Sequence, residues 1–371
     1  MGCGSMTPMA IRPDVAALPG YHFSARDHRV KLDQNESPWD LPEPLRTRAL
    51  ERVAREPFHR YPDLHAERVR AAVAALEGWP EAGVVVAGGS NVLIQAAVIA
   101  AGLGRRVLSV TPSFSVYALQ ARLLAAELRQ VPLAEGFALP RAALLHELAD
   151  GAGVHFLAAP MAPTGNPIED EDVRALARAG AGRWLTVIDE AYGAFAGSDF
   201  RSIARELDGA VSLRTLSKAF GLGGVRLGYA LTEPALAQEL QKVVLPFSVS
   251  ALQAALVETV LESPGYVAER IALIRAERER LLAALRARAA VQVFPSVTNF
   301  VLLRVKDVDA TFAGLLEQGV LVRRQDHLPG LRGCLRVSVG TPDENDAFLA
   351  ALDACTDVPA ATSEGNRHAH A

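Results

Sequence analysis

Cysteine is scarce in this sequence, and so are the features of exported or membrane proteins. The 371 residues include Cys3, Cys334 and Cys355, which form no C-x-x-C pair. Scattered cysteines in odd number exclude a thiolate zinc site and favour a reducing compartment. We expect no secretory signal at the start of the chain, and the most apolar stretch, 91–104, is too short and interrupted to cross a bilayer. We expect a cytoplasmic protein without a metal centre or membrane contact.

The sequence also lacks an excess of charge of one sign. It has 38 basic and 42 acidic residues, a net charge of −4, and no basic stripe. Nucleic acid is therefore not an expected partner. Half of the residues are hydrophobic, which is enough for a large core. Small molecules and a second copy of the chain are the expected partners.

Short apolar runs alternate with helical patterns through the middle of the chain. This alternation predicts an α/β fold with a large, doubly wound, mostly parallel sheet. Because the runs do not alternate with polar residues, both faces of the sheet should be covered. The expected strands are 83–89, 106–110, 154–160, 184–191, 211–217 and 226–231, and the expected helices are 91–101, 114–127 and 169–180.

The pattern changes after Pro246, which predicts a smaller α+β domain. A helical stretch over 250–289, broken near Pro264, precedes further strands and helices. The strands are expected at 298–305, 319–324 and 333–340, and the helices at 310–318 and from Glu344. The predicted division is an N-terminal arm (1–40) belonging to the small domain, a large domain (41–245), the small domain (246–355) and a disordered tail (356–371).

One lysine stands where an apolar strand runs out, in the segment VSLRTLSKAFGLGGVRLGY (211–229). A lysine there often only reaches solvent or pairs with a carboxylate. The glycines that follow Lys218 let backbone approach a ligand, and Arg226 offers a planar fork that suits phosphate. The segment matches neither the phosphate-loop motif nor G-x-G-x-x-G.

Two other strand ends carry polar groups. Asp189 lies at the end of an expected strand in VIDEAY and Tyr192 follows it, although an acid there can simply cap a helix. In VVVAGGSN, a strand leads through Gly88 to Asn91 into a helix, whose first N–H groups attract anions. The carboxyl ends of neighbouring parallel strands share one crevice. A lysine, an acid and an anion site together suit pyridoxal 5′-phosphate.

In these motifs the chain resembles the fold-type I pyridoxal-phosphate aminotransferases, and it is most similar to the histidinol-phosphate aminotransferases among them. The resemblance extends from about Leu32 to Leu352. The resemblance implies that Lys218 binds the coenzyme covalently and carries the substrate proton. It implies that Asp189 holds the pyridine nitrogen protonated and that Tyr192 hydrogen-bonds the phenolic oxygen. The implied phosphate ligands are Ser217, Arg226 and the backbone at Gly89, Ser90 and Asn91.

The resemblance also implies roles away from the lysine. Phe114 would stack on the coenzyme, and Tyr61 would reach the coenzyme phosphate of the other subunit, so that the active site is completed in a homodimer. Arg336 and Arg323 would bind the substrate, and two guanidinium groups suit a dianion. Asn35 on the arm and Tyr21 as a lid residue would complete the substrate site.

Two positions depart from the family pattern. Ala162 stands where the family has an asparagine that bonds the phenolic oxygen, and a lost bond to a charged oxygen is worth roughly 1.5–3 kcal/mol. Asn91 stands where the family usually has aspartate, which should matter less because backbone N–H groups bind the phosphate there.

The leading expectation is transfer of an amino group between glutamate and imidazole acetol phosphate. The alternatives on the same fold are an aminotransferase for aromatic or other amino acids and a threonine-phosphate decarboxylase. A non-catalytic coenzyme-binding regulator is a further alternative, against which the intact Lys218 and Asp189 count.

Overall fold

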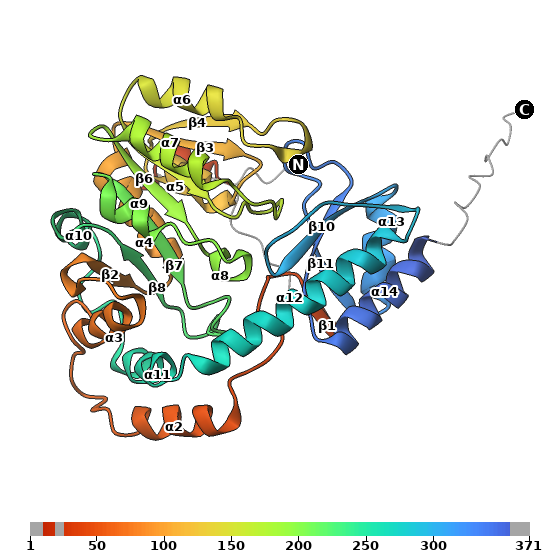
Figure 1. The fold of residues 1–371 in the computed structure, drawn as a ribbon, viewed down its shortest axis with the longest axis horizontal. Helices are drawn as coiled ribbons and strands as arrows, with labels where there is room; N and C mark the ends of the chain where they lie inside the picture. Colours follow the sequence, from red (N-terminus) through yellow and green to blue (C-terminus); the bar gives the residue numbers. More distant parts are fainter. Residues whose placement is uncertain (1–9, 19–25, 357–371) are drawn as a thin grey trace, which may run out of the picture.

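Two β-sheets organise the chain, one of seven strands and one of five (Figure 1). The computed structural model describes residues 10–18 and 26–356. The sheets occupy different parts of the molecule, and the long helix α12 (Gly265–Arg286) runs from one toward the other. None of the described helices combines the length and the apolar character that crossing a membrane requires.

The larger sheet consists of parallel strands with one reversed member. β8 runs antiparallel to both β2 and β7, and all the other pairings are parallel. This agrees with the predicted doubly wound, mostly parallel sheet. In spatial order the strands are β2 (Val84–Ala87), β8 (Gly228–Leu231), β7 (Ala210–Thr215), β6 (Trp184–Asp189), β5 (Gly153–Ala158), β3 (Arg106–Thr111) and β4 (Glu127–Pro132).

Helices cover both faces of this sheet because successive strand residues point to opposite sides. Val187 packs in the core of one face and Ile188 in the core of the other. On the first face lie α4 (Ser90–Ala97), α5 (Ser115–Leu123) and α10 (Pro234–Gln241). On the second lie α3 (Glu67–Glu77), α6 (Arg141–Ala149), α7 (Asp170–Gly180), α9 (Arg201–Glu206) and α11 (Ala251–Leu261).

The smaller sheet joins the N-terminal arm to the C-terminal part of the chain. β1 pairs in parallel with β11, whereas the other pairings are antiparallel. In spatial order the strands are β1 (Val30–Leu32), β11 (Val320–Arg324), β12 (Cys334–Ser338), β10 (Phe300–Val305) and β9 (Val291–Val293). Helices α12, α13 (Val308–Glu317) and α14 (Pro342–Thr356) border it.

The remaining helices and turns complete the fold. They are α1 (Pro13–Ala16), α2 (Glu43–Val53), α8 (Gly193–Ala196), 3-10 turns at Glu81–Gly83 and Glu135–Phe137, and a π-turn at Val98–Gly102. The domain boundaries at 40, 245 and 355 stay a prediction. Residues 357–371 of the expected tail lie outside the described residues.

The helix predicted over 114–127 is wrong at its C-terminal end. α5 stops at Leu123, and Ala125 adopts a left-handed conformation with φ of 52°. This turn reverses the chain into the edge strand β4, which begins at Glu127. Similarly, the strand predicted from 226 begins at Gly228, because Arg226 has a positive φ of 63°.

His155 is an ionisable side chain in the middle of β5. It is fully buried, and neither ring nitrogen has a hydrogen-bond partner among the described residues. Burial disfavours the charged ring and lowers the pKa of His155 from 6.5 to about 4. The unfolded chain therefore takes up this proton at higher pH than the folded chain. The stability due to the neutral ring is complete above pH 6.5 and is lost as the pH falls toward 4.

Replacing His155 with leucine should remove this pH dependence. Between pH 7 and pH 4, the free energy of unfolding of the wild type should fall by about 3 kcal/mol relative to that of the His155→Leu variant. Urea unfolding at both pH values measures the difference. The control Phe156→Leu removes bulk from the next position without removing a titratable group, and should keep the wild-type dependence. If the free energy of unfolding of His155→Leu fell as steeply between pH 7 and pH 4, the pH dependence would not come from His155.

Candidate active site

The predicted site residues of the larger sheet lie after the carboxyl ends of three parallel strands. β6 ends at Asp189, β7 leads through Ser217 to Lys218, and β2 leads through Gly88 and Gly89 into α4. In an open α/β sheet these ends border one crevice, where ligands bind. The topology thus brings the three motifs of the sequence together.

Lys218 carries an amine that ionises near neutral pH. Burial lowers its pKa from 10.5 to about 7, and the positive charge of Arg336 adds to the effect. Its Nζ donates a hydrogen bond to the carbonyl oxygen of Gln34, at 2.8 Å. A lysine with this pKa is partly uncharged at neutral pH, so it can act as a nucleophile or as a base.

Asp189 is buried, and both of its carboxylate oxygens have a donor. The backbone N–H of Ala191 donates to Oδ1 at 3.0 Å, and the hydroxyl of Tyr117 donates to Oδ2 at 2.6 Å. Burial raises the pKa of Asp189, and these two hydrogen bonds oppose that rise. The carboxylate is therefore held in one orientation at the strand end.

Tyr117 is a site residue that the sequence analysis missed. Its ring stacks on that of Phe156, with centroids 4.6 Å apart, and it meets the ring of Phe114 edge-on at 5.6 Å. A usable signal lay in its place in the sequence: Phe114 is the N-cap of α5 and Tyr117 lies in the first turn, so the tyrosine is close to the residue expected to stack on the ligand.

The arm reaches Tyr192 through Asn35. The Asn35 Nδ2 donates to the Tyr192 hydroxyl oxygen at 2.9 Å. Asn35 is buried with a left-handed φ of 54°, its N–H donates to Ser338 Oγ, and its carbonyl accepts from Asn299 Nδ2. Burial raises the pKa of Tyr192, so the phenol keeps its proton and remains a donor.

Ser217, Arg226, Gly89, Ser90 and Asn91 form what we call the anion cradle. The Arg226 Nη1 donates to Ser217 Oγ at 3.3 Å and to the Gly223 carbonyl at 2.9 Å. A Cβ added to Gly89 would lie 2.9 Å from Arg226 Nη2, so the guanidinium packs against that backbone. Ser90 and Asn91 begin α4, whose N–H groups favour an anion.

The two predicted substrate arginines face each other in the smaller sheet. Arg323 on β11 and Arg336 on β12 are direct cross-strand partners, so their side chains share one face. The Arg336 Nη2 donates to the Asp33 carbonyl at 2.9 Å, and its guanidinium lies over the Phe300 ring at 5.4 Å. Arg323 forms no ion pair within the described part of the chain. Two like charges opposite each other favour an anionic ligand between them.

The remaining predicted residues lie apart from this group. Tyr61 is 84% exposed, and its ring contacts Phe247 with centroids 5.0 Å apart. Tyr21 lies outside the described residues. Ala162 is buried, and Asn166 does not substitute for it, because the Asn166 amide donates to the Phe137 carbonyl at 3.1 Å.

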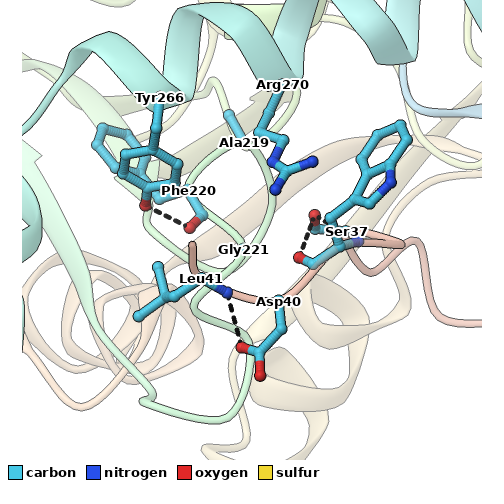
Figure 2. A pocket seen from close by; sticks show the side chains of 9 residues that line it. Ser37, Asp40, Leu41, Ala219, Phe220, Gly221, Tyr266 and Arg270 are labelled. Atoms are coloured by element: carbon cyan, nitrogen blue, oxygen red, sulfur yellow. Dashed lines mark hydrogen bonds between the residues drawn. The ribbon is translucent and has the colours of Figure 1, made fainter. Parts of the chain in front are cut away.

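The arm also supports the backbone that follows Lys218. Figure 2 shows a small pocket whose lining comes from the arm, the lysine loop and the start of α12. The Tyr266 hydroxyl donates to the Phe220 carbonyl at 2.8 Å, and the Arg270 guanidinium lies over the Trp39 ring. α12 and the arm thus hold the loop 219–221 that follows Lys218.

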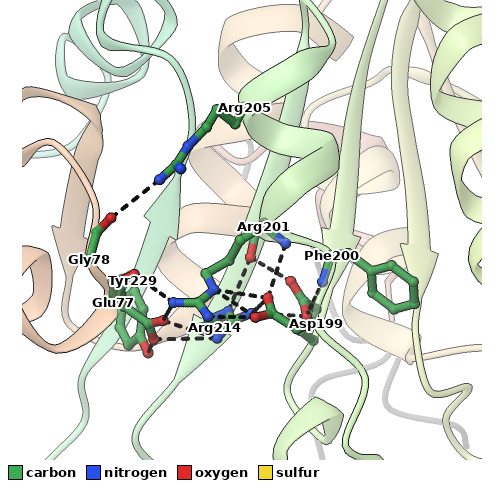
Figure 3. Close-up of polar contacts among 10 residues, drawn as sticks. Glu77, Gly78, Asp199, Phe200, Arg201, Arg205, Arg214 and Tyr229 are labelled. Carbon is green, nitrogen blue, oxygen red and sulfur yellow. Dashed lines mark hydrogen bonds and ion pairs between the residues drawn. The ribbon is translucent and has the colours of Figure 1, made fainter.

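An ionic network ties the ends of β6 and β7 together (Figure 3). Arg214 on β7 pairs with Glu77, Glu190 and Asp199. The buried Glu190, next to Asp189, also accepts hydrogen bonds from Ser212 Oγ and the Phe200 N–H. The position of Asp189 relative to the strand that leads to Lys218 is therefore set by several bonds at once.

The chain is similar in sequence to known aminotransferases. The family model described as aminotransferase class I and II matches residues 27–352. A histidinol-phosphate aminotransferase of Deinococcus radiodurans is 50% identical over 348 residues, which cover 93% of this chain and 96% of that protein.

Two solved structures illustrate the likeness in fold. A histidinol-phosphate aminotransferase of Sinorhizobium meliloti, in complex with pyridoxal-5′-phosphate, has a TM-score of 0.85 and 23% identity, covering 94% of this chain and 98% of that one. An L-threonine-O-3-phosphate decarboxylase of Porphyromonas gingivalis has a TM-score of 0.75 and 21% identity, covering 88% and 98%. At these identities the likeness is one of fold.

The contact between β8 and the anion cradle generates a testable expectation. A Cβ on Gly228 would lie 2.2 Å from the Ser90 nitrogen, so Gly228→Ala should force β8 away from the start of α4. The free energy of unfolding should fall by about 1–3 kcal/mol, and binding of inorganic phosphate should weaken. Urea unfolding and calorimetric titration test this. Gly224→Ala is the matched control, because nothing lies within 4 Å of its added Cβ; equal effects of the two variants would disprove the argument.

Proposed function

The chain belongs to the class I and II aminotransferase family, and from this membership we propose that it transfers the amino group of histidinol phosphate to 2-oxoglutarate, within histidine biosynthesis. The observation that carries the proposal is the 50% identity to a histidinol-phosphate aminotransferase across nearly the whole of both chains. The facing arginines Arg323 and Arg336 support a phosphorylated substrate.

The protein is an aminotransferase, and pyridoxal 5′-phosphate is its cofactor. When bound, this coenzyme supplies an aldehyde that takes up the amino group and a ring that accepts electrons. The residues present fit the group. The anion cradle offers N–H donors and a guanidinium for the coenzyme phosphate. Gly89 has no side chain, and a Cβ there would lie close to the Arg226 guanidinium.

We assign the contacts to the coenzyme ring as follows. Asp189, oriented by its two donors, would pair with the protonated pyridine nitrogen. The Tyr192 hydroxyl would donate to the phenolic oxygen, since its own oxygen already accepts from Asn35. Phe114 would cover one face of the ring.

Lys218 would hold the coenzyme and move the substrate proton. With a pKa of about 7, its amine is partly uncharged at neutral pH, as a group that would bind the coenzyme covalently and accept a proton from the substrate Cα requires. Its Nζ lies 5.9 Å from the centre of the Tyr192 ring, which puts the amine beside the proposed ring contacts.

The substrate would bind between Lys218, which follows a strand of the larger sheet, and the two arginines of the smaller sheet. Arg323 and Arg336 would meet its phosphate or carboxylate, and Asn35 would lie over it. Tyr21 keeps its proposed role as a lid residue. Because Ala162 supplies no side-chain donor, Tyr192 would be the side-chain donor left for the phenolic oxygen, and Asn35 would orient it.

We also propose a homodimer with shared active sites. The segments that contain Tyr61 and Leu245 lie side by side, since the Phe247 N–H donates to the Leu64 carbonyl. They expose what we call the apolar patch: Phe58, Tyr61, Leu64, Leu245, Phe247 and Leu252. Such a patch favours contact with another protein surface, here a second copy. The reaction would take place in the cytoplasm, in keeping with the free cysteines Cys334 and Cys355.

The enzymatic assignment is tested with purified protein. Histidinol phosphate and 2-oxoglutarate should yield glutamate, and Lys218→Ala should lower the rate about a thousandfold, as expected for loss of a general base. Lys242→Ala, a change at an exposed lysine, is the control. Faster turnover of phenylalanine would redirect the assignment to aromatic substrates, and release of carbon dioxide from threonine phosphate would redirect it to decarboxylation.

The homodimer is tested at the apolar patch. The wild type should sediment at twice the chain mass, and Leu245→Glu should raise the dimer dissociation constant about a hundredfold, because it introduces a charge that must be desolvated. Leu103→Glu, at another exposed leucine, should leave the dimer intact.

Mixed dimers test whether the sites are shared. Lys218→Ala subunits mixed with Tyr61→Ala subunits should recover activity if Tyr61 acts across the interface, because one site then contains both intact residues. Failure of the mixture to recover activity would contradict the shared site.

A further inference from the structure

The side chain of Gln253 links a helix terminus to the anion cradle. Gln253 lies in the first turn of α11, where it forms a capping box with Ser250: the Ser250 N–H donates to Gln253 Oε1 at 2.8 Å, and the Gln253 N–H donates to Ser250 Oγ at 3.2 Å. Its Nε2 points the other way. It donates to the Val225 carbonyl at 2.9 Å and to the Arg226 carbonyl at 3.2 Å.

Arg226 needs such support because its backbone is in an unfavourable conformation. Its φ of 63° lies in the left-handed region, which arginine rarely adopts and which persists only where surrounding contacts hold it. This conformation coincides with packing of the guanidinium against Gly89 and with its hydrogen bonds to Ser217 and Gly223. The two carbonyls that Gln253 binds flank the strained position.

We propose that Gln253 is a positioning residue for the coenzyme phosphate. By binding the carbonyls of Val225 and Arg226, it keeps Arg226 in the left-handed conformation that directs the guanidinium into the anion cradle. This inference rests on the proposed function and extends it to a residue that touches neither coenzyme nor substrate. The capping box holds the Gln253 carboxamide on α11, so the donor that binds the two carbonyls has a fixed position.

A purely structural role makes a different prediction. If Gln253 served only to cap α11, then glutamate should replace it well, because glutamate is the usual partner of serine in a capping box. Glutamate keeps the acceptor for the Ser250 N–H but has no N–H to give to Val225 and Arg226. Gln253→Glu therefore separates the two roles.

The experiment compares the binding of two probes to the cofactor-free protein. Pyridoxal 5′-phosphate and pyridoxal, which lacks the phosphate, are titrated while the visible absorbance is followed. In Gln253→Glu the dissociation constant of pyridoxal 5′-phosphate should rise about tenfold, the equivalent of one hydrogen bond. That of pyridoxal should change less than twofold, because pyridoxal does not use the cradle.

Two further variants complete the design. Gln253→Met, which has no donor and no charge, should show the same selective loss, and it replaces Gln253→Glu if that variant fails to fold. Ser250→Ala removes the hydroxyl of the capping box and leaves the Gln253 donors; it should lower the thermal midpoint without changing the ratio of the two dissociation constants.

The outcomes separate the two proposals. An unchanged ratio in the folded Gln253 variants, or an equal loss for both probes, would overturn the role of Gln253. If the wild type binds pyridoxal 5′-phosphate but borohydride reduction does not fix it to the peptide that contains Lys218, the proposed function fails instead.

Discussion

The removal of the Lys218 amine from water is the constraint on which the site depends. Burial alone shifts its pKa toward neutrality, and Arg336 reinforces the shift. Burial of a charged amine destabilises the fold because the charged form loses its hydration, so the amine must lose its charge or find an acceptor. The Gln34 carbonyl is such an acceptor for Nζ. β7, which ends shortly before Lys218 and is paired on both sides, fixes the chain that leads to it.

The ionic network around Arg214 extends this rigidity to Asp189. Replacing a buried ion pair with apolar residues is often neutral for stability, so the network is weak evidence of stabilisation. Its value is geometric: it fixes Glu190, and with it the neighbouring Asp189, against the strand that leads to Lys218. Groups that act on one small ligand must be held to within a fraction of an ångström.

The sequence predicted the parts of the structure whose signals are local. Six apolar runs identified β2, β3, β5, β6, β7 and β8, because strands buried on both faces have no polar alternation. β4 was missed because it is an exposed edge strand rich in polar residues, and β1 because its three residues pair only with a strand nearly three hundred positions away. Tyr117 and Gln253 were missed for a related reason. Their roles depend on which distant atom a side chain meets, and neither the Asp189 carboxylate nor the Val225 carbonyl can be located from neighbouring residues.

With alanine at position 162, the arm residue Asn35 would have a greater part in the proposed chemistry than the family pattern implies. The Tyr192 oxygen accepts a hydrogen bond from Asn35 Nδ2, which leaves the phenol O–H to donate to another acceptor. If the coenzyme's phenolic oxygen is that acceptor, the strength of the bond depends on Asn35, and Asn35 is fixed to the smaller sheet through Ser338 and Asn299. The smaller sheet also carries the facing arginines. The strands that carry the facing arginines therefore also hold Asn35, the residue that orients Tyr192.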